Sequence, residues 1–113
     1  MPRSGPPVYE IKAHLFRVLG HPARVRILEL LREGERSVGA LQAELGLDSG
    51  GTSQHLAALR RIGLVTARRE GTSVYYSVED GRVFDLLVAG REIITRRLAS
   101  EQSLLRELQS ESS

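Results

Sequence analysis

The first third of the chain holds two segments in which apolar residues recur at helical spacing. In the first segment they recur every three or four positions and stop at Gly20; they are Val8, Ile11, Leu15, Phe16 and Leu19. The second segment starts at Pro22, a residue that suits the first turn of a helix because its missing N–H is not needed there. The pattern predicts one helix over residues 8–19 and another from Pro22 to Gly34.

Two shorter helices are predicted next. Ser37 is a suitable N-cap for the first of them, and Gly46 is a suitable C-terminal stop. Asp48 or Ser49 can cap the second, which ends at Gly63. Two short helices joined by a brief turn that contains glycine have the form of a helix-turn-helix.

The last of these helices has two chemically different sides. At about 100° per residue, one side carries Thr52, Leu56, Leu59 and Ile62. The other side carries Ser53, Gln54, Ala57, Arg60 and Arg61. Short polar groups at the start, a small residue in the middle and cations at the end suit a helix that enters the major groove of DNA. The alternative is a polar face that contacts only water.

A β-hairpin is predicted after Gly63. Residues 64–69 and 74–78 are typical of strands, and the polar residues 70–73 form the connecting turn. Arg68 and Arg69 come just before this turn, where they could reach a neighbouring minor groove or the DNA backbone.

The final third is predicted to form one long helix, which Asp80 could cap. Its apolar stripe is close to a seven-residue repeat and consists of Val83, Leu87, Ile94, Leu98, Leu105 and Leu108. A small domain cannot bury all of this stripe, so we expect the helix to pair with a second copy of itself, assisted by the first helix. The expected dimer contacts are Val8, Ile11, Leu15, Leu87, Ile94, Leu98 and Leu105.

These elements together predict a mainly α fold with a small β-hairpin. Their order is four helices, two strands and a final helix, as in a winged helix-turn-helix that dimerises through its first and last helices. The 113 residues correspond to about one domain, over residues 8–108. We expect a flexible proline-rich arm at residues 1–7 and a frayed tail at residues 109–113.

Composition excludes several classes of function. The chain has no cysteine, so disulfides, thiolate metal sites and a cysteine nucleophile are excluded. The Gly50-Gly51 pair lacks the lysine of a phosphate-binding loop, and no Ser/His/acid motif is present, so we expect no enzymatic activity. No segment is typical of a signal peptide or a membrane span, which favours a cytoplasmic protein. The net charge is only +2, which by itself does not indicate nucleic-acid binding, so only the placement of the arginines can indicate it.

Three strings of the sequence resemble the ArsR/SmtB family of bacterial transcriptional repressors, over about Tyr9 to Leu98. They are "LGHPARVRILELL" from Leu19, "LGLDSGGTSQHLAALRRIGLV" from Leu45 and "VTARREGTSVYYSV" from Val65. The resemblance implies a homodimer of winged helices that binds an imperfect palindrome in double-stranded DNA. It also implies release of the DNA when an inducer, often a metal ion, is bound.

The resemblance further implies which residues contact DNA. The positions that match its recognition helix are Ser49, Gly51, Thr52, Ser53, Gln54 and His55. Arg60, Arg61, Arg68 and Arg69 are the expected phosphate contacts. His55 lies near the buried flank by its helical angle, so it either packs and bonds to the backbone or contacts a phosphate.

The metal sites of the family are not expected in this chain. The positions that match its cysteine pair hold Ser37 and Gly39, and the last helix has no histidine to join Asp85 and Glu92. We therefore expect no metal and no cofactor. The histidines are His14, His21 and His55, on three different predicted helices.

Two alternatives for control remain open, and so does one for function. The protein could respond to its own concentration alone. It could instead hold an apolar ligand near Phe16, Phe84 and Leu87, although these residues are ordinary for a dimer core. In place of DNA binding, the polar side of the fourth helix could bind a partner protein.

Overall fold

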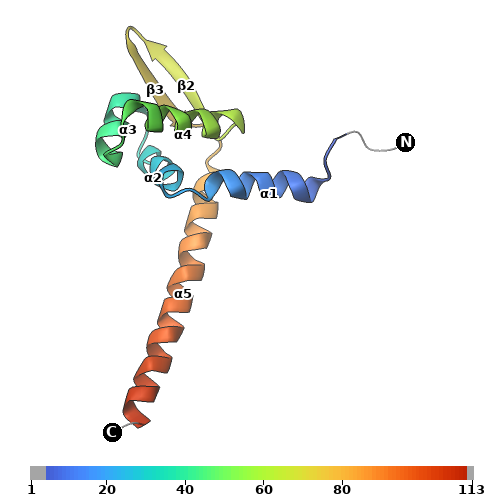
Figure 1. Ribbon diagram of the computed structural model, residues 1–113, viewed down its shortest axis with the longest axis vertical. Helices are drawn as coiled ribbons and strands as arrows, with labels where there is room; N and C mark the ends of the chain where they lie inside the picture. Colours follow the sequence, from blue (N-terminus) through green and yellow to red (C-terminus); the bar gives the residue numbers. More distant parts are fainter. Residues whose placement is uncertain (1–4, 112–113) are drawn as a thin grey trace. The chain divides into compact units, whose positions relative to one another are not determined.

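The computed structural model describes residues 5–111, which divide into two units (Figure 1). One unit runs to Gly81 and contains the first four helices and the sheet, and the other is the helix that begins at Arg82. Most of the expected N-terminal arm lies outside the described residues. The single domain expected over residues 8–108 stays a prediction.

The first two helices have the predicted starts. Helix α1 spans Val8–Leu19 and α2 spans Pro22–Leu31. The Nδ1 atom of His21 accepts a hydrogen bond from the backbone N–H of Ala23 at 3.2 Å and so caps α2. This cap and the proline at the first helical position explain why α2 begins only two residues after α1 ends.

Helices α3, Val38–Leu45, and α4, Ser49–Arg61, form the predicted helix-turn-helix. The Ser37 hydroxyl accepts a hydrogen bond from the N–H of Ala40 at 3.1 Å, which confirms Ser37 as the N-cap of α3. Between the two possible caps of α4, the structure selects Asp48. Both helix starts are therefore determined by side chains that satisfy otherwise unpaired backbone donors.

The strands form a three-stranded antiparallel sheet in the order β1-β3-β2. The predicted hairpin is present as β2, Val65–Glu70, and β3, Ser73–Val78, with a loop shorter than the expected turn because Glu70 already pairs with Ser73. The additional strand β1, Arg36–Ser37, pairs with β3 and was not predicted. Two residues are too few to show the alternating pattern by which a strand is recognised in a sequence.

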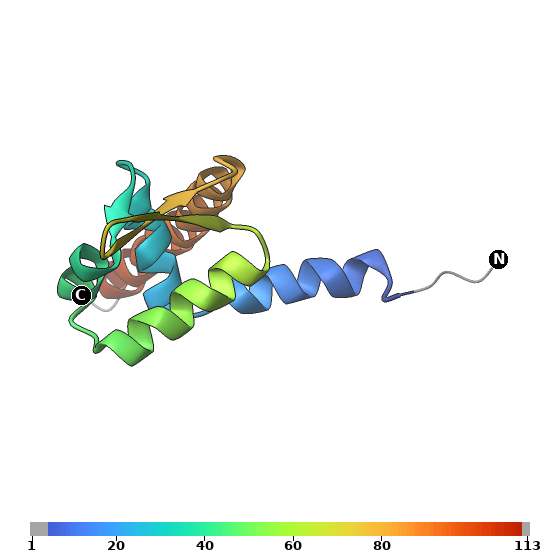
Figure 2. The same ribbon diagram turned by 90° about the horizontal axis from the view of Figure 1, so that it is seen from above.

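The core of this unit lies between α2, α3, α4 and the start of β2 (Figure 2). Its most deeply buried apolar side chains are Ile27, Leu28, Leu41, Leu56, Leu59 and Val65. Because α4 contributes two of these leucines, the core determines which side of α4 faces solvent.

The second unit is the 30-residue helix α5, Arg82–Glu111, which is about 45 Å long at 1.5 Å per residue. Residues 109–111 of the expected frayed tail are helical, and residues 112–113 lie outside the described part. Among the described residues, no helix combines the length and the apolar character needed to cross a bilayer.

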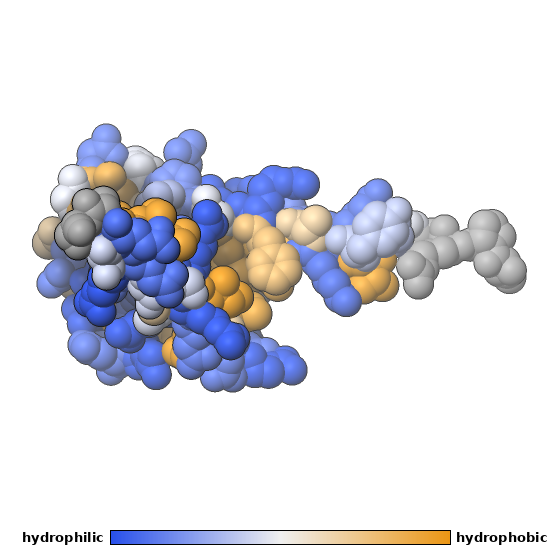
Figure 3. Space-filling model, turned by 90° about the horizontal axis from the view of Figure 1, so that it is seen from below, coloured by the Kyte–Doolittle hydropathy of each residue, from blue (hydrophilic) through white to orange (hydrophobic). Residues whose placement is uncertain are grey.

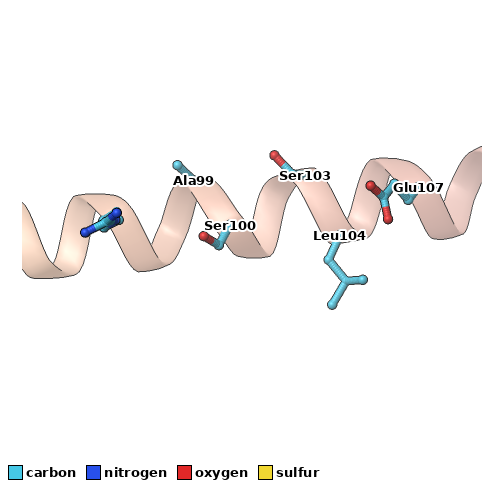
Figure 4. Close-up of a pocket in the computed structure, with 6 residues that line it drawn as sticks. Ala99, Ser100, Ser103, Leu104 and Glu107 are labelled. Carbon is cyan, nitrogen blue, oxygen red and sulfur yellow. The ribbon is translucent and has the colours of Figure 1, made fainter.

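Helix α5 leaves a large apolar stripe in contact with solvent. Six side chains of its C-terminal two-thirds are between 53% and 70% exposed: Ile93, Ile94, Leu98, Leu104, Leu105 and Leu108. A shallow hollow in this part of the helix is lined by small side chains such as Ala99, Ser100 and Ser103, all from α5 itself (Figure 4). Contiguous exposed apolar surface of this kind marks a site of association.

Helix α1 also exposes apolar side chains. Val8, Ile11 and Phe16 are exposed and Leu15 is half-buried. The apolar surface of the molecule is visible as separate orange areas among the polar residues in Figure 3. Of the dimer contacts expected from the sequence, Val8, Ile11, Ile94, Leu98 and Leu105 are exposed, and Leu15 and Leu87 are half-buried.

Candidate nucleic-acid interface

The face of α4 expected to contact DNA is open to solvent. Ser53, Gln54, Ala57, Arg60 and Arg61 are all exposed, and Leu56 and Leu59 are fully buried on the opposite side. The helical angles read from the sequence are thus confirmed. The side chains that can reach another molecule from α4 are those that combine hydrogen-bonding groups with guanidinium groups.

The start of α4 is held by a tight cap. An Asp48 carboxylate oxygen accepts a hydrogen bond from the N–H of Gly51 at 2.7 Å. A Cβ atom added at Gly51 would lie 3.0 Å from that same oxygen, so this position favours glycine. Gly51 therefore supports the cap, while Ser49, one residue after Asp48, is exposed at the open end of the helix.

The expectation that Thr52 contacts DNA is wrong. Thr52 is 0% exposed, and its hydroxyl donates a hydrogen bond to the backbone carbonyl of Asp48 at 3.0 Å. The helical angle had already placed this residue on the buried side, and the packing of α4 against the core keeps it there. A side chain with no solvent-accessible surface cannot reach a base edge.

His55 is half-buried and bonded within the protein. Its Nδ1 atom accepts a hydrogen bond from the Nε–H of Arg24 at 3.2 Å, and its ring centroid lies 4.3 Å from that of His21. Burial is the main cause that lowers the pKa of His55, followed by the charges of His21 and Arg24. Of the two roles expected for His55, the structure favours packing, with a side chain rather than the backbone as its partner.

Sequence reasoning did not identify Arg24 as part of this region. Arg24 is 31 residues from His55 in the sequence, and its guanidinium also donates to the carbonyl of Val18 at 3.3 Å. No local pattern could have indicated this contact, because it depends on how α2 packs against α4. Arg24 brings a fixed positive charge to the flank of the exposed face.

The wing, by which we mean the β2–β3 hairpin at residues 65–78, carries two arginines with different environments. Arg68 forms ion pairs with Glu35 and Glu70 and lies 4.9 Å from the ring centroid of Tyr75 on the central strand. The hydrogen bond from Arg68 is the main cause that lowers the pKa of Glu35. Arg69 points to the other face of β2, because successive side chains of a strand alternate, and it is exposed. Glu35 lies just before β1, and β3 lies between β1 and β2 in the sheet. The ion pair between Arg68 and Glu35 therefore links the two outer strands.

Three of the four arginines expected at phosphates have no acidic partner. Within residues 5–111, Arg60, Arg61 and Arg69 form no ion pair with a carboxylate. Unpaired guanidinium groups are free to bind an external anion. The described part of the chain thus places uncompensated positive charge on α4 and on the wing.

Comparison with known proteins identifies the family. The sequence profile of the bacterial regulatory proteins of the arsR family matches residues 21–67, from the cap of α2 into β2. The HTH-type transcriptional regulator Rv0081 of Mycobacterium tuberculosis is 45% identical over 103 residues, which cover 90% of each chain. This chain belongs to the arsR family of bacterial regulatory proteins.

Solved structures similar to this arsR-family chain have the same winged helix-turn-helix fold. The crystal structure of M. tuberculosis Rv0081 matches with a TM-score of 0.78 and 45% identity, over 86% of this chain and 98% of that one. The homodimeric DNA-binding domain of Mb0332 from Mycobacterium bovis, solved by NMR, matches with a TM-score of 0.72 and 32% identity, over 85% and 94% of the two chains. A probable mercury resistance operon repressor of Streptomyces lividans is 38% identical over 79 residues, 70% of this chain and 63% of that one.

In the sequence, several positions of this arsR-family chain match metal-ligating positions. The structure shows what surrounds them. Ser37 uses its hydroxyl to cap α3. Asp85 and Glu92 lie on α5, and the structure as described groups no three histidine or acidic side chains in a way that could hold a metal ion. His21, which caps α2, and His55 on α4 are neighbours in space, with their Nδ1 atoms engaged as acceptors.

Proposed function

We propose that this chain is a sequence-specific DNA-binding transcriptional repressor that acts as a homodimer on an imperfect palindrome. The observation that carries the proposal is the exposed face of α4, where Ser53, Gln54 and Ala57 precede two unpaired arginines. Base edges in the major groove are read by such hydrogen-bonding side chains near the start of a recognition helix. The buried face of the same helix holds it rigidly against the core.

Each residue of this face has a distinct proposed role. Gln54 reads a base edge, since a glutamine amide can bond both to N6 and to N7 of adenine. Ser53 and Ser49 contact bases or phosphates near the start of α4, and the small Ala57 lets the DNA approach closely. Arg60, Arg61 and, on the wing, Arg69 bind backbone phosphates; they set affinity and salt dependence rather than sequence preference.

Dimerisation follows from the exposed apolar surface. The stripe on α5 is too large to be left in water, and an identical helix offers a self-complementary surface for it. The exposed apolar residues of α1 offer further surface for pairing with a second copy of the chain. The homodimeric state named for Mb0332 supports this proposal.

A dimer would place two copies of α4 in successive major grooves about 34 Å apart. A dimer bound to its operator in this way would exclude RNA polymerase from an overlapping promoter. The repressor named among the relatives supports this direction of control. We expect the protein to act in the cytoplasm, where the bacterial chromosome lies, and we assign it no catalytic reaction.

Selection of bound fragments from the source genome with the purified protein tests this function. We expect one short palindrome to be enriched near one or a few promoters, bound by a dimer in light-scattering measurements. Gln54→Ala should lower affinity for this operator more than for random DNA, whereas Gln102→Ala, which removes the same side chain from α5, should change neither. Enrichment of no sequence, or equal losses on operator and random DNA for Gln54→Ala, would refute the proposed role of α4.

A further inference from the structure

A small basic pocket lies beside the exposed face of α4. It has a volume of about 230 Å³ and is lined by side chains of three helices and of the residue that follows α4. They are His14, Arg17 and Val18 of α1, Arg24 of α2, Ala58 and Arg61 of α4, and Ile62. The C-terminal end of α4 lies next to α1 in two views (Figures 1 and 2). The pocket therefore lies at the edge of the surface proposed to face DNA.

The charged groups around this pocket are of one sign. Three guanidinium groups and an imidazole line it, and none of its lining residues is acidic. Within the described chain, Arg17 and Arg61 have no acidic partner. Glu10 lines the adjoining hollow on α1 instead. Three arginines without a counter-charge around one cavity repel one another unless an anion binds among them.

The most buried of these arginines, Arg24, is positioned before any ligand arrives. It is half-buried, and its hydrogen bonds to the His55 ring and to the carbonyl of Val18 hold the guanidinium in place. A guanidinium that is already fixed loses little conformational freedom when it binds an oxyanion. The pocket thus combines one cation held by hydrogen bonds, Arg24, with two exposed arginines, Arg17 and Arg61.

The size and lining of the pocket match a small oxyanion. Its volume is below the 300 Å³ or more that is usual for drug-sized ligands. Its lining combines the apolar side chains of Val18, Ala58 and Ile62 with the three arginines. Guanidinium groups form bidentate hydrogen bonds with phosphate, which makes phosphate the best chemical fit.

We propose that this pocket binds a phosphate group between Arg17, Arg24 and Arg61. The phosphate belongs either to the DNA backbone at the edge of the major groove or to a free anionic molecule that competes with DNA there. The DNA source and the competition with DNA rest on the proposed function, whereas the binding of a free anion to the pocket does not. His14 also lines the pocket and adds a hydrogen-bond donor.

The free protein provides the first test, with pyrophosphate as the probe. Its binding is measured by NMR shifts of the Ala58 and Ile62 amides and by thermal shift, at constant ionic strength set with sodium chloride. Arg17→Gln should weaken pyrophosphate binding about tenfold or more, as expected for loss of a charge-assisted contact. Lys12→Gln removes one positive charge from the same helix outside the pocket and should leave the binding unchanged.

Operator duplexes with a single neutral methylphosphonate at successive positions identify the source of the phosphate. If the source is the DNA backbone, one neutral position weakens binding by the wild type but not by Arg17→Gln. If the source is a free anion, no position behaves in this way, and pyrophosphate lowers DNA affinity at constant ionic strength in the wild type only.

Equal behaviour of Arg17→Gln and Lys12→Gln in every measurement would overturn the proposal. Pyrophosphate binding that depends on Arg17 in a protein that binds no DNA would refute the proposed function and leave the pocket assignment intact.

Discussion

Arg68 and Arg69 are adjacent in the wing, but the structure indicates a structural role for Arg68 and a DNA-binding role for Arg69. This difference can be tested. Arg69 is exposed and unpaired among the described residues, whereas Arg68 is engaged by Glu35, Glu70 and the ring of Tyr75. We expect Arg69→Gln to weaken binding to all DNA sequences alike. The melting temperature should change little, because the Arg69 side chain forms no hydrogen bond or ion pair within residues 5–111 and the substitution keeps its backbone pairing with Val74.

The magnitude follows from the release of counterions. A slope of about −0.9 in log K against log salt for each phosphate makes one contact equivalent to about eightfold in affinity at 0.1 M salt relative to 1 M. A dimer loses two contacts, so Arg69→Gln should lower affinity by about 60-fold at 0.1 M salt and reduce the slope by about 1.8. Fluorescence anisotropy with a labelled operator, titrated at several salt concentrations, measures both quantities.

The control is the double variant Glu35→Gln/Arg68→Gln. It removes one negative and one positive charge, so the net charge of the chain stays the same while the ion pair is lost. We expect a lower melting temperature and an unchanged salt slope. A slope that falls by about 1.8 in this variant and stays constant in Arg69→Gln would refute the division of roles.

Other residues give further tests. Thr52→Val keeps the volume of a buried side chain but loses its bond to Asp48; we expect a loss of about 1 kcal/mol in the free energy of unfolding, from urea titration, with unchanged operator preference. Leu98→Glu on the exposed stripe of α5 should give a monomer in light scattering, and an intact dimer would place the interface elsewhere. Burial and neighbouring charges lower the pKa of His55 below its usual 6.5, so the unfolded chain takes up the proton first. The melting temperature should therefore fall as the pH drops below 6.5, and His55→Gln, which can still accept a bond from Arg24, should flatten this fall.

The helices and their exposed faces could be predicted because their causes are local. Ser37 and Asp48 cap helices through bonds to N–H groups three residues ahead, so the signal for each helix start lies within one turn of sequence. The same holds for the sides of α4, since a helix of known period with one apolar stripe has only one way to face a core. The face of α4 expected to contact DNA could therefore be predicted from the sequence, without the tertiary structure.

The rest depended on contacts between distant segments. Arg68 and Glu35 are 33 residues apart, and Arg24 and His55 are 31 residues apart. Sequence pattern treated Arg68 as equivalent to Arg69 and His55 as a residue of uncertain role, because the partner of each lies on another element. The basic pocket likewise combines residues from three helices.

The sequence by itself determined the order of the helices and the hairpin, the starts of the first four helices and which side of α4 meets solvent, since each of these depends on hydrogen bonds and apolar spacing within a few residues. Only the tertiary structure decided which arginines are already neutralised and which remain available to an anion. That distinction depends on where folding brings carboxylates and imidazoles from other segments, and no local spacing in the sequence records it.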